Sequence, residues 1–166
     1  IKKLNKMKQN TELKIKELGL GLPPPPKPGG VYKPVLVADK FLYVSGQGPV
    51  KSDGTLMTGK LGDDMGLEEG KLAARQVGLA MLSTIKEHFG ELNRIKRLVK
   101  VLGMVNCTSD FQQQPVVING FSELMAEVFG EENFISEIIW KKKHAYGRGH
   151  TFIIPQTEYI LCYAKN

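Results

Sequence analysis

The chain has 166 residues and a formal net charge of +6 at pH 7, and 42% of its residues are hydrophobic. This length and composition predict one globular domain with a single core. They exclude a membrane span, because no run of about eighteen apolar residues is present. Two distant cysteines, Cys107 and Cys162, exclude a disulfide framework or a zinc cluster and favour a reducing cytoplasm.

The positive charge is concentrated at the two ends of the chain. Basic residues are frequent in residues 1–22 and 133–166, whereas the stretch 23–132 is close to neutral. A nucleic-acid-binding domain carries its basic residues on a folded face, so we interpret the ends as solvated tails and do not expect nucleic acid as a partner. The chain opens at Ile1 without an apolar leader, and Met7 is an alternative start.

The first thirty residues predict a helix followed by an extended arm. Residues 8–20, "KQNTELKIKELGL", form a weak amphipathic pattern. Four prolines follow in "GLPPPPKPGG", and they favour an extended polyproline conformation. We interpret this segment as a structural arm, with an SH3-type ligand as the alternative.

Two strands and a long helix come next. "KPVLVA" and "FLYVSG" are rich in β-forming residues, and "ADK" between them predicts a tight hairpin. The pattern from Leu67 to Phe89 is helical, with Gly90 as its stop. Its apolar residues recur at helical spacing and are expected to face a sheet. They are Leu72, Val77, Ala80, Met81, Ile85 and Phe89.

A second strand–helix pair completes the pattern. "RIKRLVKVLGMVNC" (94–107) predicts a central strand, and Pro115 can occupy the first turn of a helix that ends near Phe129. This order predicts an α+β fold, a mixed sheet with two helices packed on one face. We find no nucleotide-binding glycine motif, and His88, His144 and His150 have no metal-ligand spacing, so we expect neither cofactor nor metal.

Several blocks of residues 8–132 closely resemble the Rid/YjgF family, which is also known as endoribonuclease L-PSP-like. They include "PKPGGVYKPVLVADKFLYVSGQGPV", "GKLGDDMGLEEGKLAARQVG" and "VINGFSELMAEVFGEE". The helix and proline arm match the branch with an extra N-terminal helix. The resemblance implies a chorismate-mutase-like fold, a homotrimer with ligand sites between subunits, and hydrolysis of reactive 2-imino acids to 2-oxo acids and ammonia.

The same resemblance assigns substrate-binding positions in this sequence. Tyr32 matches the early-loop tyrosine of the family, Ser45 and Gly46 match its "VSGQ" strand end, and Asn119 matches the asparagine on the exposed face of the second helix. Each residue also has a structural alternative. Tyr32 could pack half-buried, Ser45 could simply end a strand, Gly46 could serve a turn, and Asn119 could bond locally. We interpret Cys107 as a strand-end core residue rather than a nucleophile.

After Glu132 the family's usual arginine-bearing segment and last strand are replaced. Residues 129–166, "FGEENFISEIIWKKK…EYILCYAKN", resemble a piece of the Mod subunits of type III amino-group DNA methyltransferases. The D-P-P-Y motif and the glycine-rich cofactor motif of those enzymes are absent from this sequence, so the segment cannot methylate by itself. We therefore divide the chain into residues 1–30, 31–132 and 133–166, the last supplying replacement strands.

In this arrangement Arg148 stands where the carboxylate-binding arginine belongs, and Glu158 lies near the water-orienting position. The leading hypothesis is a cytoplasmic imine deaminase that needs no cofactor, acts as a homotrimer, and takes a small 2-imino or 2-oxo acid. The alternatives are a non-catalytic trimeric binding module and, ranked last, a nucleic-acid-binding or RNA-cleaving protein or an inactive methyltransferase-fragment fusion.

Overall fold

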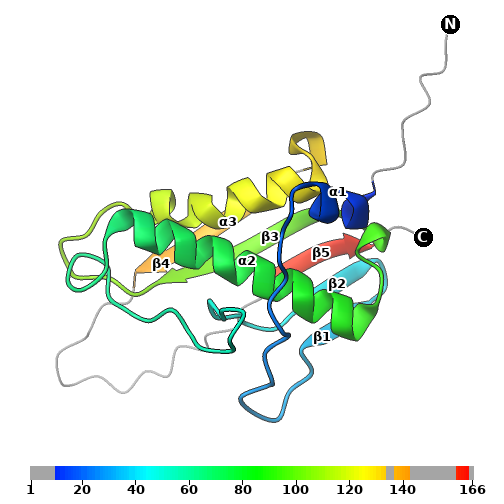
Figure 1. The fold of residues 1–166 in the computed structure, drawn as a ribbon, viewed down its shortest axis with the longest axis horizontal. Coiled ribbons are helices and arrows are strands. Elements are labelled where there is room, and N and C mark those ends of the chain that lie inside the picture. Colours follow the sequence, from blue (N-terminus) through cyan, green and yellow to red (C-terminus); the bar gives the residue numbers. More distant parts are fainter. Residues whose placement is uncertain (1–9, 134–136, 143–159, 165–166) are drawn as a thin grey trace, which may run out of the picture.

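The computed structural model describes residues 10–133, 137–142 and 160–164. They form an α+β fold in which helices α2 and α3 lie across one face of a five-stranded sheet of order β1-β2-β5-β3-β4 (Figure 1). The elements are α1 (Thr11–Glu17), β1 (Val35–Ala38), β2 (Phe41–Val44), α2 (Leu67–Phe89), η1 (Leu92–Arg94), β3 (Ile95–Val105), α3 (Gln114–Phe129), η2 (Glu131–Asn133), β4 (Glu137–Lys142) and β5 (Ile160–Ala164). No described helix combines the length and the apolar character that crossing a bilayer requires.

The predicted hairpin joins β1 to β2. The two strands are antiparallel and only Asp39 and Lys40 separate them. Asp39 has a φ of 52°, a left-handed conformation that aspartate tolerates better than most residues. Side chains alternate between the two faces of the sheet along β2, and Leu42 and Val44 are the buried ones. These two side chains therefore point toward the helices.

The segment after residue 132 supplies two strands of the sheet. β5 lies between β2 and β3 and is antiparallel to both, whereas β4 is parallel to β3 at the sheet edge. The long β3 serves both neighbours, because its first half pairs with β5 and its second half pairs with β4. The sheet is therefore mixed, as predicted, and residues Ile160–Ala164 of the C-terminal segment form its strand β5.

Helix α2 has the predicted bounds, and its ends carry the expected signals. The carboxylate of Glu69 accepts a hydrogen bond from the Gly66 N–H at 2.8 Å, which satisfies a donor at the positive end of the helix. Gly90, with a φ of 95°, ends the helix. The prediction for Leu72 was wrong, because this side chain is 59% exposed and points away from the core.

The two long helices approach each other closely where α2 and α3 cross. A Cβ atom at Gly120 would overlap the carbonyl oxygen of Lys71, so only glycine permits this backbone contact. At the surface the guanidinium of Arg75 forms two hydrogen bonds to the Glu127 carboxylate, at 2.7 and 3.2 Å. Buried side chains of α3, which include Phe121, Leu124, Met125 and Val128, fill the space between helices and sheet.

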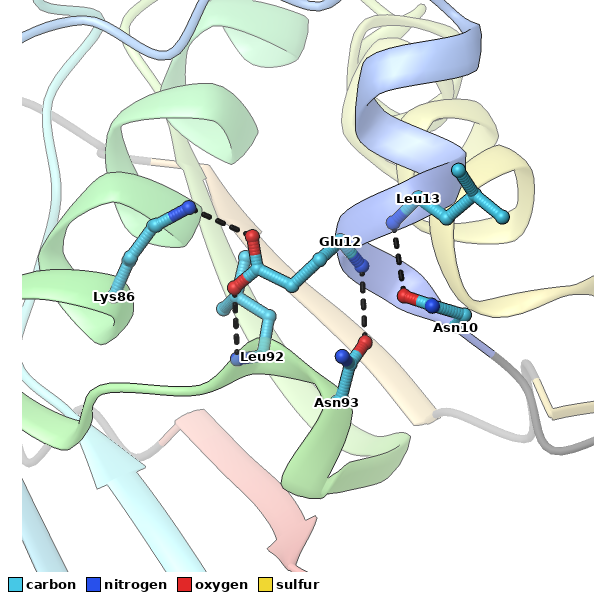
Figure 2. Close-up of polar contacts among 6 residues, drawn as sticks. All are labelled: Asn10, Glu12, Leu13, Lys86, Leu92 and Asn93. Carbon is cyan, nitrogen blue, oxygen red and sulfur yellow. Dashed lines mark hydrogen bonds and ion pairs between the residues drawn. The ribbon is translucent and has the colours of Figure 1, made fainter.

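Helix α1 is fastened to the body of the domain by Glu12, as Figure 2 shows. Its carboxylate accepts hydrogen bonds from Lys86 Nζ at 2.7 Å and from the Leu92 N–H at 3.3 Å, and the Glu12 N–H donates to Asn93 Oδ1 at 3.0 Å. The proline arm is held as well, because the buried Ser83 hydroxyl donates to the Pro23 carbonyl at 2.6 Å. The interpretation of residues 21–30 as a structural arm agrees with this contact.

Candidate functional site

A cleft of about 450 Å³ opens between the second half of β3, the first half of α2, the start of α3 and the loop after β2. Its walls are mostly apolar. Met57, Met65, Ala73, Val77, Val101 and Phe121 are representative of them. The polar side chains among the described lining residues are those of Gln47, Thr58 and Asn106. This size and this balance of apolar to polar groups are typical of a small-molecule site.

A larger depression of about 890 Å³ lies between α1, the proline arm and α2. Its charged lining residues include Glu12 and Lys86, which already bind each other. It is more open than the cleft, and its polar groups serve to attach α1. We therefore take the smaller cleft as the candidate functional site.

The loop after β2 forms one border of the cleft. Gly46 and Gln47 line the cleft, but Ser45 does not. The Ser45 hydroxyl donates to the Lys33 carbonyl at 2.7 Å, and its N–H donates to the Pro34 carbonyl at 2.9 Å. Ser45 thus ties the loop before β1 to the end of β2.

Tyr32 belongs to that same loop before β1. Its side chain is 49% exposed, and its hydroxyl accepts a hydrogen bond from the Gly29 N–H at 3.2 Å. The structure brings Tyr32 to the segment that Ser45 holds, but Tyr32 is not among the described lining residues. Asn119 is exposed on α3 as predicted, and it is likewise outside the described lining, although its neighbour Ile118 takes part in it.

The three polar side chains of the cleft, Gln47, Thr58 and Asn106, were not predicted as site residues, and hydrogen bonds fix two of them. Gln47 donates from Nε2 to the Ser45 carbonyl at 3.1 Å, and its Oε1 accepts from the buried Thr84 hydroxyl at 3.0 Å. Asn106 donates from Nδ2 to the Gly59 carbonyl at 2.8 Å. The signal for both was their position, because each polar side chain follows closely after the end of a strand.

Cys107 has the structural character that the sequence analysis expected. It is half-buried against the core, and its sulfur accepts a hydrogen bond from Gln114 Nε2 at 3.4 Å. The described residues hold no group of three His, Cys, Asp or Glu side chains that could bind a metal ion. Arg148 and Glu158, the predicted catalytic residues, lie outside the described residues.

The cleft has little electrostatic character of its own. None of its described lining residues carries a charged side chain. One carboxyl with a perturbed pKa is Asp53, in the turn 51–55: hydrogen bonds from the Thr55 hydroxyl and the Thr55 N–H lower its pKa below 3.8. Asp53 does not line the cleft. Its carboxylate instead stabilises the turn through the two hydrogen bonds from Thr55.

Comparisons with known proteins place this fold in a family. Residues 12–146 match the model of the family described as "YjgF/chorismate_mutase-like, putative endoribonuclease", so the match continues beyond Glu132. Protein TCP17 of Trypanosoma cruzi is 39% identical over 118 residues, which cover 71% of this chain and 74% of that protein.

Solved structures agree with the sequence match. Protein Atu1372 of Agrobacterium tumefaciens, of unknown function, has a TM-score of 0.74 at 29% identity and covers 95% of this chain and 94% of its own. A "putative endoribonuclease" of Shewanella oneidensis MR-1 has a TM-score of 0.79 at 27% identity, with 93% and 99% covered. The described α+β architecture and the match over residues 12–146 lead to one conclusion: the chain belongs to the YjgF/chorismate-mutase-like family, the Rid family.

Proposed function

We propose that this protein binds a small 2-imino or 2-oxo acid in the cleft and hydrolyses the imine to the 2-oxo acid and ammonia. The observation that carries the proposal is the cleft itself, which is about 450 Å³ in volume and is bordered by the Gly46–Gln47 loop at the end of β2. A family resemblance alone would not locate a site. The cleft offers a concave, largely apolar volume with a few polar groups at its border.

The reaction needs few groups because the substrate is already electrophilic. A water oxygen attacks the C=N carbon and forms the C–O bond, and the nitrogen gains one proton from that water, which gives a carbinolamine. The proton of the carbinolamine hydroxyl then passes to the nitrogen as the C=O bond forms and the C–N bond breaks, and ammonia is released. A positioned base or hydroxyl accelerates the first step and a proton donor accelerates the last one. The water supplies the carbonyl oxygen of the 2-oxo acid, and neither oxidation nor reduction takes place.

The substrate's carboxylate requires donors, and the loop after β2 has several. Within the described part of the chain, the N–H groups of Gly46, Gln47 and Gly48 donate to no acceptor. Successive peptide N–H groups can bind an anion. In this proposal the Arg148 guanidinium adds a charged, bidentate contact, and Glu158 orients the attacking water.

The test is imine hydrolysis. An amino-acid oxidase generates 2-iminopropionate in situ, and its decay is followed with and without the purified protein, beside the variants Arg148→Ala and Arg75→Ala. Arg75 is the matched control, because it also loses a guanidinium but contacts Glu127 at the surface. The proposal expects wild type and Arg75→Ala to accelerate the decay and Arg148→Ala to lose most of the acceleration. If the imine decays no faster with wild-type protein than in buffer alone, the proposed catalysis is refuted.

A non-catalytic binding module is the second candidate. It is favoured by the absence of any titratable side chain among the described residues that line the cleft, since a hydrolase needs a group that moves protons. Titration with a 2-oxo acid separates the two candidates. Binding without imine turnover supports the module, whereas binding with turnover supports the enzyme.

We further propose a homotrimer. Leu42 and Val44 face the helices, so Tyr43 and its cross-strand partner Leu36 face the opposite side of the sheet, where Leu36 is exposed. An exposed apolar sheet face is typical of a subunit interface. Analytical ultracentrifugation tests this proposal. Leu36→Lys should dissociate the trimer and so lower the average molecular mass in solution, whereas Leu13→Lys, on the exposed side of α1, should leave that mass unchanged. A wild-type monomer at micromolar concentration would contradict it.

The origin of the last strands is a separate proposal. We infer that residues 129–166 derive from a methyltransferase-like sequence that now supplies β4 and β5. The support is the resemblance of the amino-acid sequence of that segment to the Mod subunits. Sequencing genomic DNA and transcript across the codons for residues 120–166 tests it, and a transcript that does not continue through this region would contradict it.

We also propose a cytoplasmic location, in line with the unpaired Cys107.

A further inference from the structure

We infer that Thr84, a buried residue of α2 outside the described lining of the cleft, is a positioning residue for the carboxylate of the substrate. Through Gln47 it fixes the middle of the loop after β2. The inference rests on the proposed function, because it assumes that the N–H groups of this loop bind the carboxylate. It holds whether the rest of the ligand lies in the cleft or against a neighbouring subunit.

The two ends of this loop are held by the segment before β1 and by α2. At its start, Ser45 donates hydrogen bonds to the carbonyls of Lys33 and Pro34 at 2.7 and 2.9 Å. At its end, the Val50 carbonyl accepts a hydrogen bond from Gln76 Nε2, and the Val50 side chain is buried. Both ends are therefore attached independently of the middle.

The middle of the loop has one side chain that can attach it, because Gln47 lies there between Gly46 and Gly48. Gln47 Nε2 donates to the Ser45 carbonyl at 3.1 Å, which is a hydrogen bond within the loop. Gln47 Oε1 accepts a hydrogen bond from the Thr84 hydroxyl at 3.0 Å. Among the described residues, this second hydrogen bond is the one that ties the middle of the loop to the helix layer.

Thr84 is itself firmly placed. Its side chain is 1% exposed, and its neighbour Ile85 is fully buried. Branching at Cβ restricts the χ1 angle of a threonine in a helix, and a buried hydroxyl that loses its partner costs free energy. The Thr84 hydroxyl therefore orients the Gln47 amide from a position that the ligand does not reach.

The carboxylate contact gives Thr84 a kinetic signature. The substrate's carboxylate keeps its charge throughout the hydrolysis, since the bonds that change are those of the C=N carbon. The N–H groups of the loop therefore stabilise substrate and transition state equally, and losing their alignment raises KM without lowering kcat. A hydrogen bond to a charged group changes affinity by roughly tenfold to a hundredfold.

The experiment compares Thr84→Val and Thr84→Ser with wild type in the imine hydrolysis assay. Thr84→Val keeps the shape of the side chain but removes the hydroxyl, so the KM for 2-iminopropionate should rise about tenfold while kcat stays within about twofold. Thr84→Ser keeps the hydroxyl and should restore a KM close to that of wild type.

Ser83→Ala is the matched control. It removes a neighbouring buried hydroxyl of α2 that binds the Pro23 carbonyl instead, so its KM should not change. A merely structural role of Thr84 would lower the fraction of folded protein, and therefore the apparent kcat, without raising KM. An unchanged KM in Thr84→Val, or an equal rise in Ser83→Ala, overturns the inference.

Gln47→Leu tests the route. If Thr84 acts through Gln47, then Gln47→Leu raises KM by at least the same factor, and adding Thr84→Val to it raises KM no further. Two increases that multiply in the double variant overturn the inference. If Thr84→Val does not fold, Gln47→Leu alone decides, because an unchanged KM in that variant also overturns it.

Pyruvate binding separates this inference from the proposed catalysis. Isothermal titration calorimetry gives the dissociation constant of pyruvate for the same full-length variants. If wild type binds pyruvate without hydrolysing the imine, the proposed catalysis fails, and the dissociation constants decide the inference by the pattern expected for KM. If wild type neither hydrolyses the imine nor binds pyruvate, the proposed function fails and the inference fails with it.

Discussion

The contact between α2 and α3 at Gly120 makes a strong prediction about stability. In Gly120→Ala the new Cβ would overlap the Lys71 carbonyl oxygen and lie 2.8 Å from the Lys71 carbonyl carbon and 3.1 Å from its Cα. Carbon atoms pack at about 3.5–4.0 Å, and backbone atoms cannot rotate away as a side-chain end can. The two helices would therefore have to separate.

The size of the effect follows from two opposing contributions. Alanine in a helix interior is favoured over glycine by about 1 kcal/mol, whereas forcing an extra carbon into a packed contact costs about 1–3 kcal/mol and sometimes more. Here the obstacle is backbone, so we expect the upper end of that range or beyond, and a net loss of about 2 kcal/mol in the free energy of unfolding. A stabilised Gly120→Ala protein would mean that the helix contact is not as close as described.

Urea unfolding followed by circular dichroism measures this loss at a fixed protein concentration. The matched control is Gly78→Ala in α2, where a Cβ would lie 2.7 Å from Leu124 Cδ2 and 3.0 Å from Met125 Cε. These atoms are side-chain ends and can move, so the control should lose distinctly less stability than Gly120→Ala. Equal losses in the two variants would refute the distinction between backbone and side-chain obstacles.

Three further predictions concern the attachments around the domain. Glu12→Gln removes the charge that binds Lys86 at 2.7 Å while keeping an acceptor, so thermal unfolding should show a loss of at most about 1 kcal/mol, smaller in high salt. Ser83→Ala removes the buried donor to the proline arm, and we expect a loss of about 1 kcal/mol and faster proteolysis within residues 21–30. Thr55→Val should raise the pKa of Asp53 toward 3.8 in an NMR titration; because folding lowers this pKa, its stabilising effect is present at neutral pH and lost as the pH falls through the folded-state value.

Local patterns predicted the elements well where the physical signal was local. The bounds of α2 are marked by acidic residues in its first turn and by Gly90 at its end, and both signals lie within a few residues of the helix. The β1–β2 hairpin depends on a two-residue turn at Asp39. Such features are decided by neighbours in the sequence, so they can be read without knowledge of the rest of the chain.

The error at Leu72 shows where this reading fails. Large apolar residues alone do not mark the buried face of α2, because it also contains the small residues Gly70, Ala74 and Gly78. Of these, Gly78 lies against Leu124 of α3. Close helix packing requires small residues, and a count of large ones cannot detect it. Leu72 lies on the other side of the helix and is exposed.

The cleft could not be predicted because its walls come from segments far apart in the sequence. Its described lining residues run from Gly46 to Phe121, and only the fold brings them together. The motif "VSGQ" marked the correct strand end, but it gave no means to see that Ser45 holds the loop before β1 while Gly46 borders the cleft. Within one short motif, adjacent residues therefore have different roles.

The position of this border depends on a residue outside the described lining of the cleft. The hydroxyl of Thr84, buried on α2, holds the Gln47 side chain, and Gln47 in turn holds the Ser45 carbonyl. The loop that carries Gly46 is thus fixed from the helix layer as well as from the strand. Any ligand bound at this border is accordingly positioned by the packing of α2 on the sheet, so a change at Thr84 would move the polar border of the cleft without altering its apolar walls.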